Sequence, residues 1–302
     1  MLRKKLVKKF WDRSHFLNTK NKRYSKQVIK LIEKKAKEDK IKNDITTDAL
    51  IKKSKNIEAS IVSKQEGIVA GIEEISLFLK KNKLNFIVLK KDGQRVKDKE
   101  IIIKIKGNAR KILVYERTIL NILQRMSGIA TKTYELNRIT KGHCCVAGTR
   151  KTLFDLLDKK SISVGGGLTH RLNLNDSILI KDNHLKILNN DIKKALALAN
   201  KTKTKFIEIE VENENEAIDA SRAISNLKSN KLFAIMFDNM NPIEIKKTVK
   251  KIKALDKNIL FEASGNINDG NIRKYSKTGV DIVSLGSVTH SAKAFDLSLG
   301  IE

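Results

Sequence analysis

Cysteine and aromatic residues are scarce in this sequence, and each scarcity excludes a class of protein. The two cysteines, Cys144 and Cys145, are adjacent, so they cannot cross-link distant parts of the chain, and a disulfide-stabilised secreted scaffold is excluded. No cluster of cysteine and histidine has the spacing of a zinc site. Aromatic residues make up only 5% of the chain, and no stacking signature typical of nucleic-acid-binding modules is present.

Long apolar runs are absent as well. No run approaches the roughly 20 residues that a membrane-spanning helix needs. The segment of residues 1–9 is rich in lysine and arginine, but no apolar stretch follows it, so we expect neither a signal peptide nor a membrane segment. A composition of 40% hydrophobic and 32% charged residues over 302 positions indicates a globular protein with one large or two ordinary domains. We therefore expect a cytoplasmic location.

Acidic residues are too few to balance the basic ones, and the formal net charge is +28. Such an excess suits a polyanionic partner, either a nucleic acid or a phosphorylated substrate. Lysine, however, is spread along the whole chain rather than gathered in one segment. We attribute most of the charge to this lysine-rich composition, and we expect no specific nucleic-acid partner.

The first half of the chain has the pattern of a basic arm followed by a small α+β domain. Residues 1–24 are polar and basic, and we expect them to form a loosely held arm. Apolar residues recur at helical spacing over residues 25–38. Short apolar runs between residues 57 and 112 are separated by turn-forming residues, as in an antiparallel sheet. A long amphipathic helix follows and ends at Lys141 and Gly142.

After Gly142 short apolar runs alternate with amphipathic helices. The runs cover residues 144–147, 161–164, 177–180, 206–209, 233–236, 259–261 and 280–283, and the helical segments include 192–199, 216–227 and 243–255. Repeated βα units predict a parallel sheet, either doubly wound or closed as a barrel. Polar, charged or glycine residues follow each run. In a parallel barrel these strand ends meet on one face, where such folds place active sites, so we favour an α/β barrel.

Basic residues follow three successive runs of this predicted barrel: they are Arg150, Lys151, His170, Arg171 and Lys181. Any one of them could be a solvated loop charge. Five at consecutive strand ends would instead gather in one pocket, where arginine and lysine bind carboxylates or phosphates. We therefore predict a site for a small polyanion.

Carboxylates are expected in the same pocket. Strand alternation over residues 208–212 puts the three glutamates on one face, and with the apolar residues against the outer helices the glutamates point inward. We predict that Glu210 and Asp238 hold sugar hydroxyls or Mg²⁺ and stabilise positive charge on a sugar, whereas Glu208 is structural. The glycine-containing ends at residues 264–266 and 286–287 could cradle a phosphate with backbone N–H groups.

A series of motifs covering residues from about 38 to the C-terminus resembles the quinolinate phosphoribosyltransferase family. The motifs are NDITT at residues 43–47, EGIVAG at 66–71, ERT at 116–118, NILQRMSGIAT at 121–131, TRKT at 149–152, VGGG at 164–167, HRL at 170–172, IKDNH at 180–184, EIEVE at 208–212, MFDNM at 236–240, EASGN at 262–266 and SLGSVTHSA at 284–292. Two departures are Leu153–Asp155 in place of a usual Thr-Pro-Gly and Asn173 in place of a usual glycine, and neither removes a charge from the pocket.

The resemblance implies an α/β protein with an N-terminal α+β open-faced sandwich domain and a seven-stranded TIM-like α/β barrel. On this basis we assign residues 25–125, joined by the C-terminal segment 291–302, to the sandwich and residues 126–290 to the barrel. The resemblance also implies a homodimer or higher even oligomer whose active sites are shared between subunits. The implied reaction joins quinolinate to phosphoribosyl pyrophosphate and gives nicotinate mononucleotide, pyrophosphate and CO₂, with Mg²⁺ and without an organic cofactor.

Site residues are carried over from the resemblance position by position. Quinolinate would be bound by Arg117 (from the neighbouring subunit), Arg150, Lys151, His170, Arg171 and Lys181; ribose and Mg²⁺ would be held by Glu210 and Asp238, the metal directly or through water; the 5′-phosphate would be held by Ser264, Gly265, Gly286 and His290. Lys151, Lys181, Glu210 and Asp238 would form the catalytic set.

Three alternatives remain open from the sequence. A paralogous family associated with molybdenum transport shares the barrel and several motifs, but tends to lack the lysine that stands here at Lys181. A basic nucleic-acid-binding protein would explain the net charge, but it lacks a recognisable reading motif. A non-catalytic structural role is disfavoured because the predicted carboxylates and cations are all present.

Overall fold

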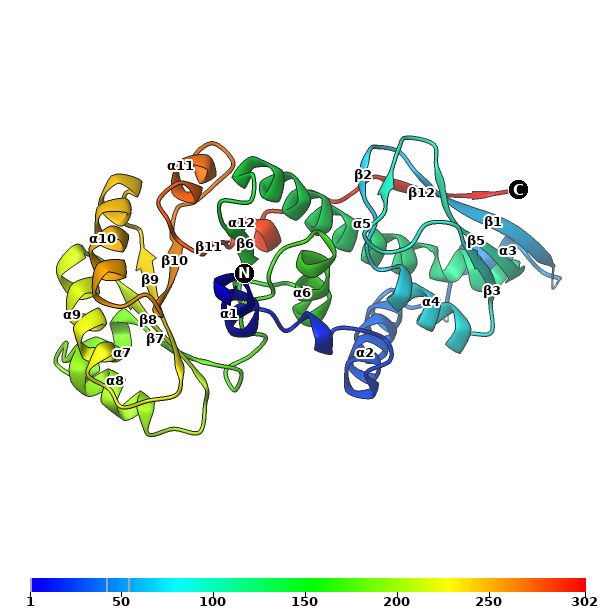
Figure 1. The fold of residues 1–302 in the computed structure, drawn as a ribbon. Helices are drawn as coiled ribbons and strands as arrows, with labels where there is room; N and C mark the ends of the chain where they lie inside the picture. The colour runs from blue at the N-terminus through cyan, green and yellow to red at the C-terminus, as the bar shows by residue number, and fades with distance from the viewer. Residues whose placement is uncertain (1, 42, 54) are drawn as a thin grey trace. The chain divides into compact units, whose positions relative to one another are not determined.

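The computed structural model describes residues 2–41, 43–53 and 55–302, which divide into two compact units (Figure 1). The barrel unit contains residues 2–13, 135–151 and 167–287, and the sandwich unit contains residues 14–134, 152–166 and 288–302. The N-terminal residues of the chain therefore belong to the barrel unit and the C-terminal residues to the sandwich unit. Across the described residues no helix has both the length and the apolar character needed to cross a membrane.

The sandwich unit is built on a four-stranded antiparallel sheet with the strand order β12-β1-β5-β3. These strands are β12 (Leu297–Ile301), β1 (Asn56–Ser63), β5 (Ile101–Asn108) and β3 (Asn85–Val88), and a small ribbon pairs β2 (Gly67–Ile68) with β4 (Arg95–Val96). The C-terminal segment contributes an edge strand, with Ile61 of β1 opposite Leu299 on one side and Ile103 on the other. The predicted antiparallel sheet is confirmed.

The helices of the sandwich unit follow the predicted apolar spacing. They are η1 (Ser14–Phe16), α2 (Lys22–Glu38), α3 (Ile45–Leu50), α4 (Ile72–Lys81), α6 (Asp155–Val164), most of α12 (Ser287–His290) and the first part of the 32-residue helix α5 (Ala109–Thr140). In α2 the buried residues Val28, Ile32 and Ala36 recur every four positions, and Asn21 caps the first turn. Both long helices predicted from periodicity are therefore present.

The barrel unit is built on a six-stranded parallel sheet with the order β6-β11-β10-β9-β8-β7. The strands are β6 (Cys145–Gly148), β7 (Ile178–Ile180), β8 (Phe206–Val211), β9 (Leu232–Asp238), β10 (Leu260–Ser264) and β11 (Ile282–Leu285); the helices are α7 (Asp182–Ile187), α8 (Ile192–Asn200), α9 (Glu214–Ser225), α10 (Pro242–Leu255) and α11 (Ile272–Ser276). Figure 1 shows α8, α9 and α10 on the outer side of the strands. The fold is thus the expected α/β combination of an N-terminal α+β domain and a TIM-like barrel.

One expected strand is a helix. Residues 161–164 form the end of α6, where Leu157, Ser161 and Ile162 lie on one buried face and the Ser161 hydroxyl donates to the Leu157 carbonyl. This spacing is helical, and a four-residue window is too short to distinguish it from a strand. Leu168 instead bridges to Ala147 of β6 in parallel and supplies a seventh strand position. Residues 169–177, all described, then form a loop rather than a crossover helix.

The first residues form a helix rather than a loosely held arm. Helix α1 (Leu2–Trp11) buries Val7, Phe10 and Trp11 at helical spacing. These side chains form one core cluster with five barrel residues: Ala147, Leu168, Ala234, Leu260 and Ile282. Leu260 and Ile282 are the first residues of their strands, so α1 packs at the amino end of the parallel sheet. The Arg3 guanidinium also pairs with Asp281 at 2.6 Å.

Candidate active site

The carboxyl ends of β7, β8 and β9 bring one lysine and two carboxylates together. Lys181 directly follows β7, and its ammonium Nζ lies 3.0 Å from Oε2 of Glu210 in β8. Burial raises the pKa of Glu210, Lys181 opposes this shift, and the negative charge of Asp238 adds to it. Asp238 ends β9, the neighbouring strand, and is only partly buried. The structure therefore brings together three of the four predicted catalytic residues.

The positive charges of Arg150, which follows β6, and Arg171, in the loop that follows Leu168, act on each other. Burial lowers the pKa of Arg171, and the nearby positive charge of Arg150 lowers it further. The Arg171 side chain is held by donation from Nη1 to the Ser177 carbonyl at 3.2 Å. Lys151 is exposed, next to Arg150. Like charges that repel are stabilised when an anion binds near both of them, so the arginine pair suits a carboxylate or phosphate ligand.

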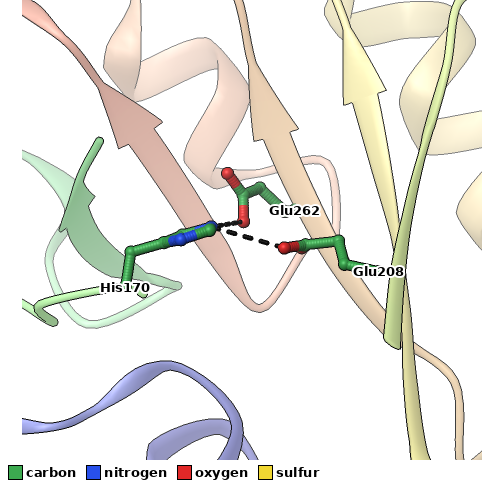
Figure 2. A group of neighbouring side chains, drawn as sticks. All are labelled: His170, Glu208 and Glu262. Carbon is green, nitrogen blue, oxygen red and sulfur yellow. Dashed lines mark hydrogen bonds and ion pairs between the residues drawn. The ribbon is translucent and has the colours of Figure 1, made fainter. Parts of the chain in front are cut away.

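His170, the residue before Arg171, lies in a buried cluster with two glutamates (Figure 2). Its Nε2 is 2.9 Å from Oε2 of Glu262 and 3.4 Å from Oε2 of Glu208. Its Nδ1 accepts the backbone N–H of Arg171 at 2.9 Å. Both ring nitrogens are thus engaged within the protein. The imidazole therefore contacts the Arg171 backbone, whereas the family resemblance implied direct contact with quinolinate.

The His170 cluster has the donor atoms of a metal site, but its hydrogen bonds indicate a proton. Burial raises the pKa of Glu208 to about 8 and the neighbouring Glu262 adds to the shift, so one carboxyl group of the pair keeps a proton at neutral pH. Burial lowers the pKa of His170, but Glu262 and Glu208 raise it to about 9, so the ring keeps its Nε2 proton and donates it to Glu262. A cation bound at Nε2 would need that proton removed and Nδ1 protonated, which the Arg171 contact opposes.

The late strands β10 and β11 end in closely packed turns. Gly265 has a φ of +85°, and a Cβ built there would lie 2.3 Å from Oδ1 of Asn239. The Asn239 N–H donates to the Ser264 carbonyl at 3.0 Å, and the hydroxyl groups of Ser264 and Ser284 are 3.0 Å apart. Ser284 is two residues before Gly286 on β11, so Ser264, Gly265 and Gly286 come together at the ends of adjacent strands.

Two predicted site residues belong to the sandwich unit. Arg117 lies on α5 with 63% of its side chain exposed, and its Nη2 is 3.6 Å from Oε1 of Glu116. It lines a hollow of about 470 Å³ that also includes Lys35 and Phe154. His290 is exposed at the end of α12, with Nδ1 2.6 Å from the Ser291 hydroxyl oxygen. The barrel unit alone therefore supplies the remaining ten predicted site residues.

Three residues of the site region were not predicted: Trp11, Arg13 and Glu262. Glu262 precedes Ser264 by two positions on β10, so strand alternation gives both side chains the same facing. Because Ser264 was a predicted site residue, this shared facing could have indicated from the sequence that Glu262 lies near the site. Trp11 and Arg13 lie in the stretch expected to be an arm, and only the spacing of Val7, Phe10 and Trp11 could have indicated a buried helix face.

Comparisons with known proteins agree with this geometry. A family model described as "Quinolinate phosphoribosyl transferase, C-terminal domain" matches residues 129–300, and the corresponding N-terminal domain model matches residues 44–127. The "Probable nicotinate-nucleotide pyrophosphorylase [carboxylating]" of Methanothermobacter thermautotrophicus is 36% identical, over 85% of this chain and 93% of that protein. The protein of the same name from Methanocaldococcus jannaschii is 37% identical, over 91% and 97%. The solved nicotinate-nucleotide pyrophosphorylase of Francisella tularensis superposes with a TM-score of 0.80 at 32% identity, covering 92% of this chain and 97% of that one.

Proposed function

Because the chain belongs to the quinolinate phosphoribosyltransferase family, we propose that the carboxyl end of its barrel joins quinolinate to phosphoribosyl pyrophosphate in NAD biosynthesis. The chain is a pentosyltransferase of the nicotinate-nucleotide pyrophosphorylase type. The observation that carries the site assignment is the Lys181–Glu210 pair beside Asp238, at the ends of three neighbouring strands.

Quinolinate is a dicarboxylate, and the arginine pair suits it. Arg150 and Arg171 would bind its carboxylates with Lys151, and Lys181 would approach the ring from the next strand end. His170 would contribute by holding the Arg171 backbone rather than by touching substrate. Ser264, Gly265 and Gly286 would hold the 5′-phosphate of the sugar, because they come together at the ends of β10 and β11, where backbone N–H groups can bind an anion.

The chemistry has two steps. The ring nitrogen of quinolinate forms a bond to C1 of the ribose while the C1–O bond to pyrophosphate breaks, and the electron pair leaves with pyrophosphate. Glu210 and Asp238 would stabilise the positive charge that develops on the sugar. The pyridinium then accepts the electron pair of the C–CO₂ bond as CO₂ leaves, and the ring carbon takes up a proton. The substrate ring serves as its own electron sink, so the proposal needs no organic cofactor.

Glu210 and Asp238 also fit a Mg²⁺ ion. They lie on adjacent strands, and the charge of Asp238 raises the pKa of Glu210, which indicates two carboxylates close enough to repel. Oxygen ligands of this kind suit Mg²⁺ together with phosphate groups. When bound, the metal would neutralise charge on the leaving pyrophosphate.

We further propose a cytoplasmic homodimer, or a higher even oligomer, in which Arg117 reaches the active site of the neighbouring subunit. Its support is the large exposed fraction of the Arg117 side chain and the hollow beside it. A binding arginine of this kind would add a further cation to a dicarboxylate site.

The assignment is tested by replacing Lys181. Lys181→Met should lower kcat/KM by about 100-fold or more, because it removes the cation that pairs with Glu210 at the reacting end of the site. Lys186→Met is the matched control, since Lys186 pairs with Asp182 on the exposed face of α7. Nicotinate mononucleotide formation should be followed for both. Equal activities of the two variants would contradict the site assignment.

A further inference from the structure

Trp11, the last residue of helix α1, and Arg13, two residues beyond it, contact the loop that carries Arg171. We call residues 169–177 the arginine loop. It connects Leu168 to β7 and contains His170 and Arg171. Trp11 and Arg13 lie before residue 44, where the first family-model match begins. Nothing in the comparisons therefore assigns them a role.

Arg13 holds both ends of the arginine loop. Its backbone N–H donates to the Thr169 hydroxyl at 2.8 Å, at the start of the loop. Its Nε donates to Oδ1 of Asp176 at 2.5 Å, near the end of the loop, and the other Asp176 oxygen accepts the Leu172 N–H at 2.9 Å. The Arg13 and Asp176 side chains are only 7% and 13% exposed. The guanidinium also lies 4.7 Å from the ring centroid of Phe206, which fixes its direction.

Trp11 acts on the same loop from inside the barrel. Its indole Nε1–H donates to Oε1 of Glu208 at 3.2 Å, and both residues are about 99% buried. The second oxygen of Glu208 faces the His170 ring at 3.4 Å (Figure 2). Since a hydrogen bond to one oxygen restricts the rotation of a carboxyl group, Trp11 limits the orientations of the group that contacts His170.

His170 transmits these contacts to Arg171. Its backbone φ of +53° is in the left-handed region, which a non-glycine residue keeps only when its surroundings hold it there. The ring accepts the Arg171 N–H through Nδ1 and meets Glu262 through Nε2. The direction in which Arg171 leaves the loop therefore depends on a ring that Glu208 and Glu262 contact at Nε2.

We propose that Trp11 and Arg13 are positioning residues that hold the arginine loop so that Arg171 meets a quinolinate carboxylate. This inference rests on the proposed function and gives the N-terminal helix a part in substrate binding. Neither residue touches substrate. Trp11 acts through Glu208 and His170, and Arg13 acts through Thr169 and Asp176.

The test compares Trp11→Phe and Arg13→Met with Arg3→Met in the full-length chain. Trp11→Phe keeps most of the ring packing and removes the N–H, and Arg13→Met removes the guanidinium. Arg3→Met is the matched control, because Arg3 also anchors α1 to the barrel, but through Asp281 and Ile259, which directly precede β11 and β10 and are far from the arginine loop in sequence. KM for quinolinate, KM for phosphoribosyl pyrophosphate, kcat and the melting temperature would be measured for each.

We expect Trp11→Phe and Arg13→Met to raise KM for quinolinate by about tenfold while KM for phosphoribosyl pyrophosphate stays within about twofold, as for a misplaced binding group. Arg3→Met should lower the melting temperature without changing either KM. Combining Arg13→Met with Asp176→Asn should add little to the single effect, because both changes break one contact.

Two results would overturn the inference. One is a loss of activity that is proportional to the fall in melting temperature in all three variants, which would mean that Trp11 and Arg13 have a structural role alone. The other is an unchanged KM for quinolinate in Trp11→Phe, which decides the matter even if Arg13→Met does not fold. A wild-type chain inactive with both substrates would instead overturn the proposed function, and this inference with it.

Discussion

Replacing Glu74 by glutamine should stabilise the protein at alkaline pH. Glu74 lies on α4 with none of its side chain exposed, and burial raises its pKa to about 7, with Asp92 adding to the shift. Burial likewise raises the pKa of Asp92 to about 6. Glu74 Oε2 and Asp92 Oδ2 are both buried without a hydrogen-bond partner, whereas Glu74 Oε1 accepts the Tyr24 hydroxyl at 2.7 Å. The native carboxyl group is therefore costly to ionise.

The sign of the pH dependence follows from this raised pKa. In the unfolded chain Glu74 loses its proton near its ordinary value of 4.5, whereas in the folded chain it does so near 7. Stability is therefore highest at low pH for this group, falls between about 4.5 and 7, and stays low above that. The full difference between the two pKa values corresponds to roughly 3 kcal/mol of unfolding free energy. Because Glu74 and Asp92 titrate as a pair, we assign about 2 kcal/mol of it to the ionisation of Glu74.

Glutamine removes the ionisation and keeps the hydrogen bond to Tyr24, since its amide oxygen still accepts. Urea unfolding of wild type and Glu74→Gln should give similar free energies at pH 5 and a variant more stable by about 2 kcal/mol at pH 8.5. Glu73→Gln on the same helix is the control, because Glu73 is 44% exposed and its replacement should have little pH-dependent effect. A Glu74→Gln effect that is the same at both pH values would refute the reasoning.

Three further outcomes are expected. The kcat/KM for nicotinate should be two to three decades below that for quinolinate, because a cation left without its carboxylate costs roughly 2–4 kcal/mol. Comparable turnover of both acids would contradict a dicarboxylate site. Gly265→Ala should raise KM for phosphoribosyl pyrophosphate, since its Cβ would lie 2.3 Å from Asn239, whereas Gly142→Ala, at φ +75° with nothing within 4 Å, should leave KM unchanged; equal KM values would remove Gly265 from the phosphate site. A heterodimer of Arg117→Ala and Lys181→Ala chains, purified with two tags, should recover about half of the wild-type activity if Arg117 acts in trans; an inactive heterodimer would place Arg117 in cis.

Periodicity and strand-end chemistry predicted most of the fold. Strand alternation predicted that the side chains of Glu208 and Glu210 lie on one face of their strand. In the structure Glu208 belongs to the His170 cluster and Glu210 pairs with Lys181. Successive polar strand ends predicted the meeting of Lys181, Glu210 and Asp238 because parallel strands end on the same side of the sheet. These inferences depend only on local period and strand direction.

The remaining features depend on contacts between distant residues. Glu262 meets His170 across 92 positions and Trp11 meets Glu208 across 197, and no local pattern encodes either pairing. Residues 161–164 were expected to be a strand because a short apolar run fits either period. The N-terminal helix was missed because basic residues outnumber its three buried side chains, so composition concealed the spacing. Residues 152–166 likewise belong to the sandwich unit because of their packing contacts, which their order in the sequence does not reveal.

The account is tested most directly with quinolinate labelled in the carboxylate next to the ring nitrogen. With phosphoribosyl pyrophosphate and Mg²⁺, the wild-type chain should release one labelled CO₂ for each pyrophosphate and each nicotinate mononucleotide formed. Omission of phosphoribosyl pyrophosphate should abolish the release, because decarboxylation needs the pyridinium. Release of CO₂ without that substrate, or pyrophosphate formed without labelled CO₂, would contradict the proposed reaction.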